Sequence, residues 1–295
     1  MSVVALDAAW LAAHPLRLPE GEVDKNARGT VMAVGGSLIA PGAIRLAAEA
    51  ALRAGAGKVR IGGPAPLAHH LAMAVPEAGV LGLPVSKGGD LTAGGLGALR
   101  ESLGRCDTLV MGPGMGNPKG VRSLVKALLG EARDGMSLVL DAAAISCSGK
   151  LGRLIADHGG RVVMTPHHGE MAALLRCAEE DVAADDETTA RDAAQSFGAV
   201  IVLKSARTVV AAPDGTTLRY EGGGVGLATG GSGDVLAGIA GGLLSRGHDP
   251  LAAAAWAVWL HGEAGRKLAR EIGPIGFLAR ELLTEVPGLM ASLEG

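Results

Sequence analysis

The sequence has 295 residues, of which 48% are hydrophobic and only 2% aromatic, and it contains 47 glycines. This length and apolar content suffice for a large aliphatic core, which excludes a disordered chain. The formal net charge of -3 offers no basic surplus for a nucleic-acid backbone, and few aromatic side chains are available to stack on bases.

The first 28 residues are rich in proline and charge, and we predict an irregular lead-in there. After it, short β-branched runs alternate with Ala- and Leu-rich stretches of helical periodicity. We predict strands at 30–34, 58–61, 108–111, 137–140, 161–164 and 200–203, and a hairpin from 208 to 220. We predict helices at 42–54, 120–129, 169–175, 188–197, 234–246 and 250–270.

Alternating strands and helices predict an α/β fold: one domain over residues 1–295, with helices on both faces of a mostly parallel sheet. Ligands of such sheets bind beyond the carboxyl ends of the strands. The chemistry is therefore expected in the segments that follow the strands, where many of the glycines cluster. The three cysteines are scattered without metal-binding spacing, and neither a signal peptide nor a membrane span is indicated, so we expect a cytoplasmic protein.

The segment from Ala228 to Gly238 carries the strongest chemical signal, because a glycine-rich loop runs there into a helix. Free N–H groups at a helix start bind anions. Asp234 falls in the first turn beside them, where it could act as the general base for a hydroxyl that attacks a phosphoryl group. The alternative is that Asp234 only caps the helix.

Two further segments follow predicted strands and carry charge. Lys204 is placed to neutralise phosphate oxygens, although a surface lysine is an equal alternative. Glu170 begins a helix after Pro166-His167-His168 and could hold a phosphate-bound Mg²⁺ through water, or simply interact with the helix dipole. Zinc is disfavoured here, since adjacent histidines rarely ligate one ion and no third ligand is evident. The glycine runs at 35–36 and 112–116 lack a dinucleotide-binding G-x-G-x-x-G pattern.

Taken together, these segments make the chain resemble the ADP/ATP-dependent NAD(P)H-hydrate dehydratases of the ribokinase-like superfamily. The most specific matches are residues 51–57 (Ala-Leu-Arg-Ala-Gly-Ala-Gly) and 165–170 (Thr-Pro-His-His-Gly-Glu), and the resemblance covers about residues 24 to 287. It implies a repair enzyme that uses ADP or ATP to phosphorylate and then dehydrate the (6S)-hydrate of NADH or NADPH. It also implies Mg²⁺, a homotetramer and a separate epimerase partner, since no epimerase domain is recognised in this sequence.

The resemblance assigns roles residue by residue. Asp234 would be the base, with Gly231 and Gly233 in the anion-binding loop, and Glu170 would help to organise Mg²⁺. The hydrate would contact Ala43, Gly116, His167 and Asp234, and the adenine nucleotide would contact Lys204, Ser205, Ala206, Arg207, Thr208 and Gly233.

The chain departs from the family pattern at three places. Ala143 stands where a second aspartate is usual, Ser205 replaces a glycine, and 223–226 is a looser glycine run. Two other functions stay open: a related kinase for a hydroxymethylpyrimidine, thiazole or pyridoxal-type alcohol, and a nucleotide-binding protein that has lost catalysis.

Overall fold

A computed structural model describes residues 3–16 and 24–292. Within them lies one ten-stranded sheet with the strand order β1-β10-β9-β8-β7-β6-β5-β2-β3-β4. The strands are β1 (Val4–Ala5), β2 (Thr30–Val34), β3 (Lys58–Pro64), β4 (Ala78–Leu83), β5 (Thr108–Met111), β6 (Ser137–Leu140), β7 (Val162–Met164), β8 (Val200–Leu203), β9 (Arg207–Ala211) and β10 (Thr217–Glu221). Every neighbouring pair from β8 to β4 is parallel, whereas β9 is antiparallel to both β8 and β10.

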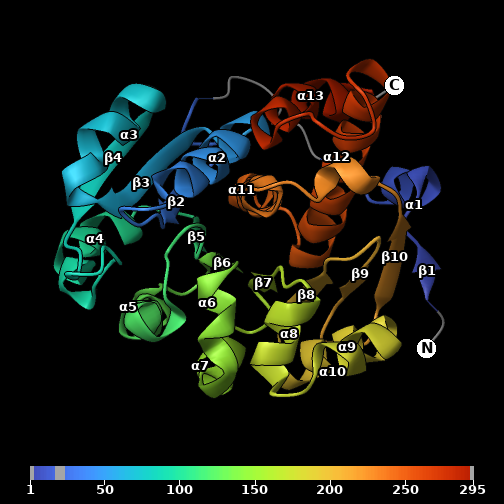
Figure 1. The fold of residues 1–295 in the computed structure, drawn as a ribbon, viewed down its shortest axis with the longest axis horizontal. Coiled ribbons are helices and arrows are strands. Elements are labelled where there is room, and N and C mark those ends of the chain that lie inside the picture. The colour runs from blue at the N-terminus through green and yellow to red at the C-terminus, as the bar shows by residue number, and fades with distance from the viewer. Residues whose placement is uncertain (1–2, 17–23, 293–295) are drawn as a thin grey trace.

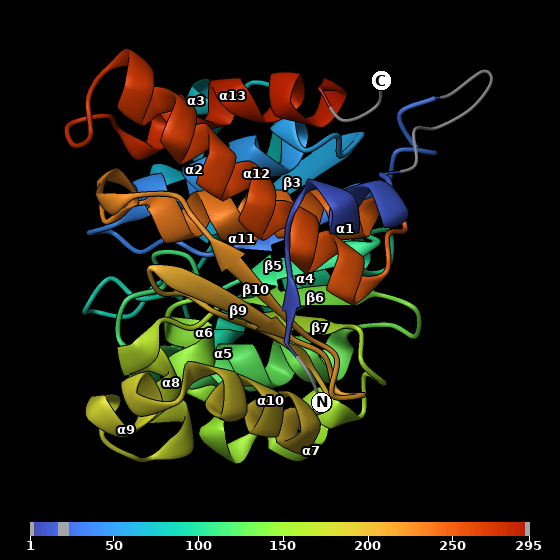
Figure 2. The ribbon, with the colours of Figure 1, turned by 90° about the vertical axis from the view of Figure 1, so that its right-hand side faces the viewer.

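Helices cover both faces of this sheet, as Figures 1 and 2 show. One face carries α1 (Ala8–Ala13), α2 (Pro41–Arg53), α3 (Ala68–Ala74), α11 (Ser232–Ser245), α12 (Pro250–Glu271) and α13 (Ala279–Ala291). The other carries α4 (Leu96–Leu103), α5 (Pro118–Glu131), α6 (Ala143–Ser146), α7 (Gly152–Ala156), α8 (His168–Leu175), α9 (Glu179–Ala184) and α10 (Asp186–Phe197). Short 3-10 helices lie at Ala65–Leu67, Ala93–Gly95, Ser148–Lys150 and Val225–Leu227. The three-layer α/β prediction is confirmed.

The central strands are largely apolar because both faces of the sheet are buried there. In β2, Val31 and Ala33 face the core under α2 and α11, while Met32 and Val34 face the core under α4 and α5. Strand residues alternate between faces, so both sets must be apolar when both faces are covered.

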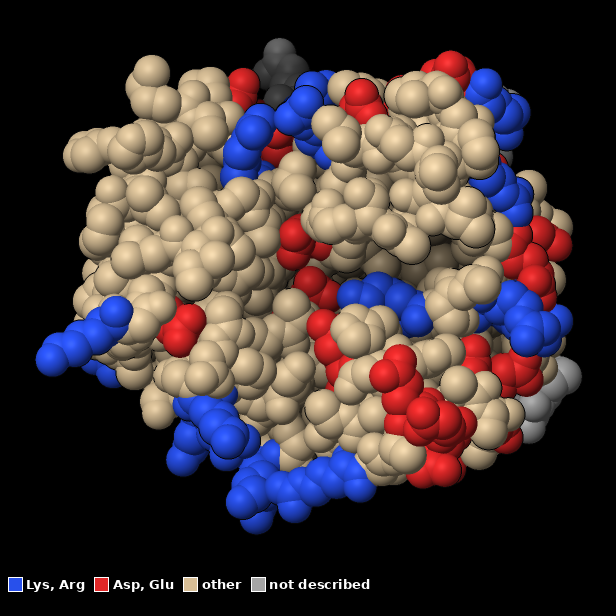
Figure 3. Space-filling view, in the orientation of Figure 1, with Lys and Arg blue, Asp and Glu red and all other residues tan. Residues whose placement is uncertain are grey.

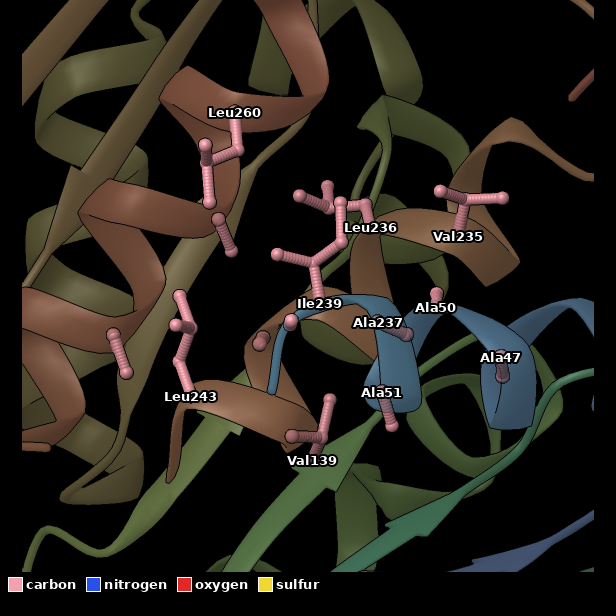
Figure 4. Packing of buried hydrophobic residues seen from close by; sticks show 14 of the residues in the cluster. Ala47, Ala50, Ala51, Val139, Val235, Leu236, Ala237, Ile239, Leu243 and Leu260 are labelled. Atoms are coloured by element: carbon pink, nitrogen blue, oxygen red, sulfur yellow. The ribbon is translucent and has the colours of Figure 1, made fainter. Parts of the chain in front are cut away.

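The α11 helix is the central helix of one face and packs very closely on α2 (Figure 4). A Cβ atom built at Gly238 would lie 2.2 Å from the carbonyl oxygen of Ala47, and one at Gly242 would lie 2.5 Å from that of Ala51. Glycine on α11 and alanine on α2 therefore let the two backbones touch. This contact fixes the position of the helix whose first turn contains Asp234.

The prediction of an irregular lead-in over residues 1–28 is wrong for its first half. Residues Val4–Ala5 form β1, which pairs in parallel with β10 at the edge of the sheet. Asp7 then caps α1 by accepting a hydrogen bond from the Trp10 amide, and Leu11 is fully buried. This short strand gains its stability from a partner about two hundred residues away, which no local pattern reveals. Residues 17–23 lie outside the described residues.

Candidate active site

Three adjacent parallel strands end beside one another, and each is followed by a polar side chain. Asp141 follows β6, Thr165 follows β7, and Lys204 follows β8. The Thr165 hydroxyl donates to Asp141 Oδ1 at 2.7 Å, and Lys204 Nζ donates to the same oxygen at 3.1 Å. Asp141 is only 2% exposed, so this ion pair and hydrogen bond satisfy a carboxylate that burial would otherwise disfavour.

Glu170 joins this cluster from the first turn of α8. Its carboxylate accepts a hydrogen bond from the His167 amide at 2.9 Å, while His167 Nδ1 accepts from the amides of Gly169 and Glu170. The same carboxylate lies 3.6 Å from Lys204 Nζ. Glu170 therefore stabilises the helix start and also faces the lysine.

Asp234 lies at the third position of α11 and does not cap the helix, because the N-cap is Gly231. Gly231 has a φ of 93°, a conformation that suits glycine, and a Cβ there would lie 2.7 Å from Leu46 Cδ1. The first helical hydrogen bond runs from the Val235 amide to the Gly231 carbonyl. The amides of Gly233 and Asp234 precede it and have no acceptor within the helix, which leaves them available to an anion.

The charges of these residues influence one another. Burial, together with the negative charges of Asp141 and Glu170, raises the pKa of Asp234 to about 7, although Lys204 opposes the shift. Burial by itself disfavours the charged form of Lys204, but the surrounding carboxylates outweigh it and raise the pKa of the lysine. The pKa of Asp234 is therefore raised toward neutral pH, which suits a group that accepts a proton during a reaction.

Two cavities open at this edge of the sheet, and Figure 3 shows a hollow bordered by basic and acidic side chains on the face viewed there. The first encloses about 760 Å³ and the second about 650 Å³. Residues predicted to bind a nucleotide line the first cavity: Lys204, Ser205, Ala206, Thr208 and Gly233. Arg207 belongs to the same turn but is exposed and does not line it.

The predicted hydrate-binding residues divide between the two cavities. Gly116 lines the second cavity, and Ala43 lies next to it, since its Cβ would be 2.8 Å from a Cβ built at Gly114. His167 instead lines the first cavity. Between the cavities lies the Lys204–Asp141 ion pair, because Lys204 lines the first and the residues directly after Asp141 line the second.

Two of the departures from the family pattern have a local structural account. Ser205 closes the turn after β8, since its hydroxyl accepts a hydrogen bond from the Arg207 amide at 3.1 Å. Ala143 lines the second cavity directly after Ala142, whose φ of 47° is strained for a residue other than glycine.

Sequence reasoning missed four residues of this site. Asp141 and Thr165 meet Lys204 only because β6, β7 and β8 are neighbours in the sheet. Ser232 and His261 line the first cavity and hydrogen-bond to each other across α11 and α12. The one available signal was position, since Asp141 and Thr165 each follow a predicted strand directly.

The described residues contain no group of three or more His, Cys, Asp or Glu side chains arranged to hold a metal ion. Mg²⁺ usually keeps several waters and binds through one or two carboxylates together with substrate phosphates. Glu170, whose carboxylate faces Lys204 beside the first cavity, fits that indirect mode of binding. Over the same residues, no helix has the length and apolarity needed to cross a membrane.

Comparison with known proteins identifies the family. A family model described as NAD(P)H-hydrate dehydratase matches residues 31–288. The chain belongs to this family. It is 46% identical over 291 residues to the ADP-dependent (S)-NAD(P)H-hydrate dehydratase of Xanthomonas campestris. The alignment covers 99% of this chain and 97% of that relative. The chain spans about half the length of bifunctional NAD(P)H-hydrate repair enzymes that it also matches, such as that of Moorella thermoacetica.

Solved structures place this dehydratase-family chain in the ribokinase-like fold. A ribokinase-like protein from Enterococcus faecalis superimposes with a TM-score of 0.86 at 26% identity, over 99% of this chain and 96% of that one. The ADP/ATP-dependent NAD(P)H-hydrate dehydratase of Bacillus subtilis, co-crystallised with ATP and Mg²⁺, superimposes with a TM-score of 0.82 at 27% identity, over 99% of both chains.

Proposed function

We propose that this protein restores NADH or NADPH from its (6S)-hydrate, with ADP or ATP as phosphoryl donor. Membership of the dehydratase family supports this proposal over a related small-molecule kinase. The observation that carries the mechanism is Asp234, a carboxylate with a pKa of about 7, placed beside unbonded helix amides and Lys204.

Asp234 acts first, as a general base that removes the proton of the C6 hydroxyl while the hydroxyl oxygen attacks the terminal phosphorus of the nucleotide. The bond from that phosphorus to its bridging oxygen breaks, so AMP leaves when ADP is the donor and ADP leaves when ATP is the donor. The amides at Gly233 and Asp234 and the ammonium of Lys204 stabilise the negative charge on the phosphoryl oxygens as it moves. Asp141 and Thr165 hold the ammonium in place for that task.

The C6 phosphate then leaves with the electrons of the C6–O bond, driven by the lone pair of the ring nitrogen. The resulting C6–N double bond acidifies the C5 protons, and transfer of one of them to the departing phosphate or to water completes the ring double bond of the reduced nicotinamide. Because that proton is acidic, no second strong base is required. Mg²⁺, when bound to the nucleotide phosphates, would neutralise their charge, and Glu170 would hold it through water.

The two ligands are assigned to the two cavities. We assign the adenine nucleotide to the first cavity, where the turn Lys204–Thr208 and Gly233 meet, and the hydrate to the second, beside Gly116 and Ala43. His167 lines the first cavity next to Glu170, so it would contact the hydrate only where the ligands meet. An oligomer and a separate epimerase that supplies the (6S) epimer complete the proposal.

The test is to incubate the purified protein with chemically prepared NADH hydrate and either ADP or ATP. Return of the near-ultraviolet absorbance of reduced nicotinamide, with one phosphate released per NADH formed, is expected. Accumulation of a stable phosphorylated product without recovered NADH would support the kinase alternative. No reaction with either nucleotide, in a sample that binds ADP, would indicate a protein that has lost catalysis.

A further inference from the structure

Ser232 and His261 form a hydrogen-bonded pair between two helices, directly beside the proposed base. Ser232 is the first residue of α11, and its hydroxyl lies 2.8 Å from Nε2 of His261 on α12. Both residues line the first cavity, and Ser232 is only 4% exposed. The pair therefore links α12 to the turn that presents the amides of Gly233 and Asp234.

Packing on α2 fixes the body of α11, but side-chain hydrogen bonds to its first turn are few. Its N-cap is Gly231, which offers no side chain to bond the free amides; Gly230 precedes it, and Gly233 follows Ser232. Among the described residues, Ser232–His261 is the one side-chain hydrogen bond made by residues 229–234. Glycine-rich backbone loses much conformational freedom when it is fixed in one geometry. An anion site that depends on fixed amides therefore needs this external attachment.

The chemistry of His261 fits a holding role better than a charge-binding one. Burial lowers its pKa to about 4; hydrogen bonding by Ser232 opposes this shift, and the nearby Lys204 adds to it. A neutral imidazole adds no positive charge for phosphate, but it can hydrogen-bond to a hydroxyl. When the Ser232 hydroxyl donates to Nε2, the bond fixes the serine and, through the chain, the two residues that follow.

We propose that His261 is a positioning residue, which acts through Ser232 to hold the Gly233 and Asp234 amides and the Asp234 carboxylate in the geometry that phosphoryl transfer requires. This inference rests on the proposed function. It gives His261 a role beyond lining the first cavity, because its effect on the reaction passes through Ser232 and the first turn of α11.

The experiment compares four variants by steady-state kinetics with NADH hydrate and ADP: His261→Leu, His261→Gln, Ser232→Ala and the double variant His261→Leu/Ser232→Ala. The leucine removes the hydrogen bond, whereas the glutamine amide can reach the position of Nε2. We expect His261→Leu and Ser232→Ala each to lower kcat about 10- to 100-fold, less than loss of a whole oxyanion donor, with the KM for ADP changed less than about threefold. We expect His261→Gln to recover most of kcat.

The double variant separates one shared role from two independent ones. Two residues that act through the same bond should show non-additive losses, so the double variant should be no slower than the worse single variant. Additive losses, or a raised KM for ADP with unchanged kcat, would overturn the proposal, the latter because it indicates direct contact with the nucleotide. If His261→Leu fails to fold, Ser232→Ala and His261→Gln still decide it. A wild-type protein that binds ADP but restores no NADH would instead refute the proposed function.

Discussion

The partly buried Asp234 should destabilise the folded protein at neutral and alkaline pH, and Asp234→Asn should remove that cost. The pKa of Asp234 rises from the ordinary 3.8 to about 7 in the fold. Since a tenfold change in proton affinity corresponds to about 1.4 kcal/mol, the ionised carboxylate costs the folded state at most about 4 kcal/mol. The variant loses the general base, so its turnover should fall by about 10²- to 10⁴-fold.

The sign of the pH dependence follows from the raised pKa. Below pH 3.8 the carboxyl is protonated in both states and the variant gains nothing. Between that pH and about 7 the unfolded chain ionises while the folded protein stays protonated, so wild-type stability falls as pH rises. The advantage of Asp234→Asn should therefore grow across this window and stay constant above it.

The assay is urea unfolding of wild type and variant from pH 4 to 9. Asp214→Asn is the matched control: its carboxylate accepts the Thr216 amide in the β9–β10 turn, and this hydrogen bond lowers the Asp214 pKa. Because the Asp214 pKa lies below the ordinary 3.8, this carboxylate is ionised in both states over most of the assayed range, so the stability difference between this control and wild type should stay nearly constant. A stability difference for Asp234→Asn that does not change with pH would refute the burial argument.

Three further predictions concern packing and the two cavities. Gly238→Ala should destabilise the fold by about 1–3 kcal/mol in urea unfolding because its Cβ meets backbone of α2, whereas Gly130→Ala, in open space on α5, should gain up to about 1 kcal/mol. Lys204→Met should weaken ADP binding in calorimetry and move the acidic limb of the activity profile above about pH 7, because Lys204 lowers the pKa of Asp234. A limb that stays in place would contradict this coupling. In Gly116→Ala the new Cβ would lie 2.0 Å from Oδ1 of Asp90. This variant should abolish hydrate use and leave ADP affinity unchanged.

The sequence predicted the buried centre of the fold better than its edges. Strands β5, β6 and β8 have the bounds that the sequence predicted, because strands covered on both faces are mostly apolar and end at clear polar or glycine signals. By contrast, β4 was missed, since Gly79 and Gly82 interrupt its pattern. α13 was missed too, and it contains Pro287.

The residues of the candidate site were also predicted unequally well. Lys204, Gly233 and Asp234 could be predicted because a local motif, a strand end or a glycine-rich helix start, marks each one. Asp141 could not be assigned to Lys204, since the two lie 63 residues apart and meet only through the order of β6, β7 and β8. Partners that tertiary structure brings together leave no spacing in the sequence.

The two cavities are built by different parts of the chain. Segments that follow β2, β4, β5 and β6 line the second cavity, whereas segments that follow β7, β8 and β10, together with α11 and α12, line the first. Asp141 joins the two sets, because it follows β6 and contacts both Thr165, which follows β7, and Lys204, which follows β8. With the ligands assigned as proposed, mutation in the loops of the second cavity would change which hydroxyl compound is accepted and leave the phosphoryl-donor site in the first cavity intact. Because the two cavities are lined by different loops, the same fold can accept different substrates while its phosphoryl-transfer site is unchanged.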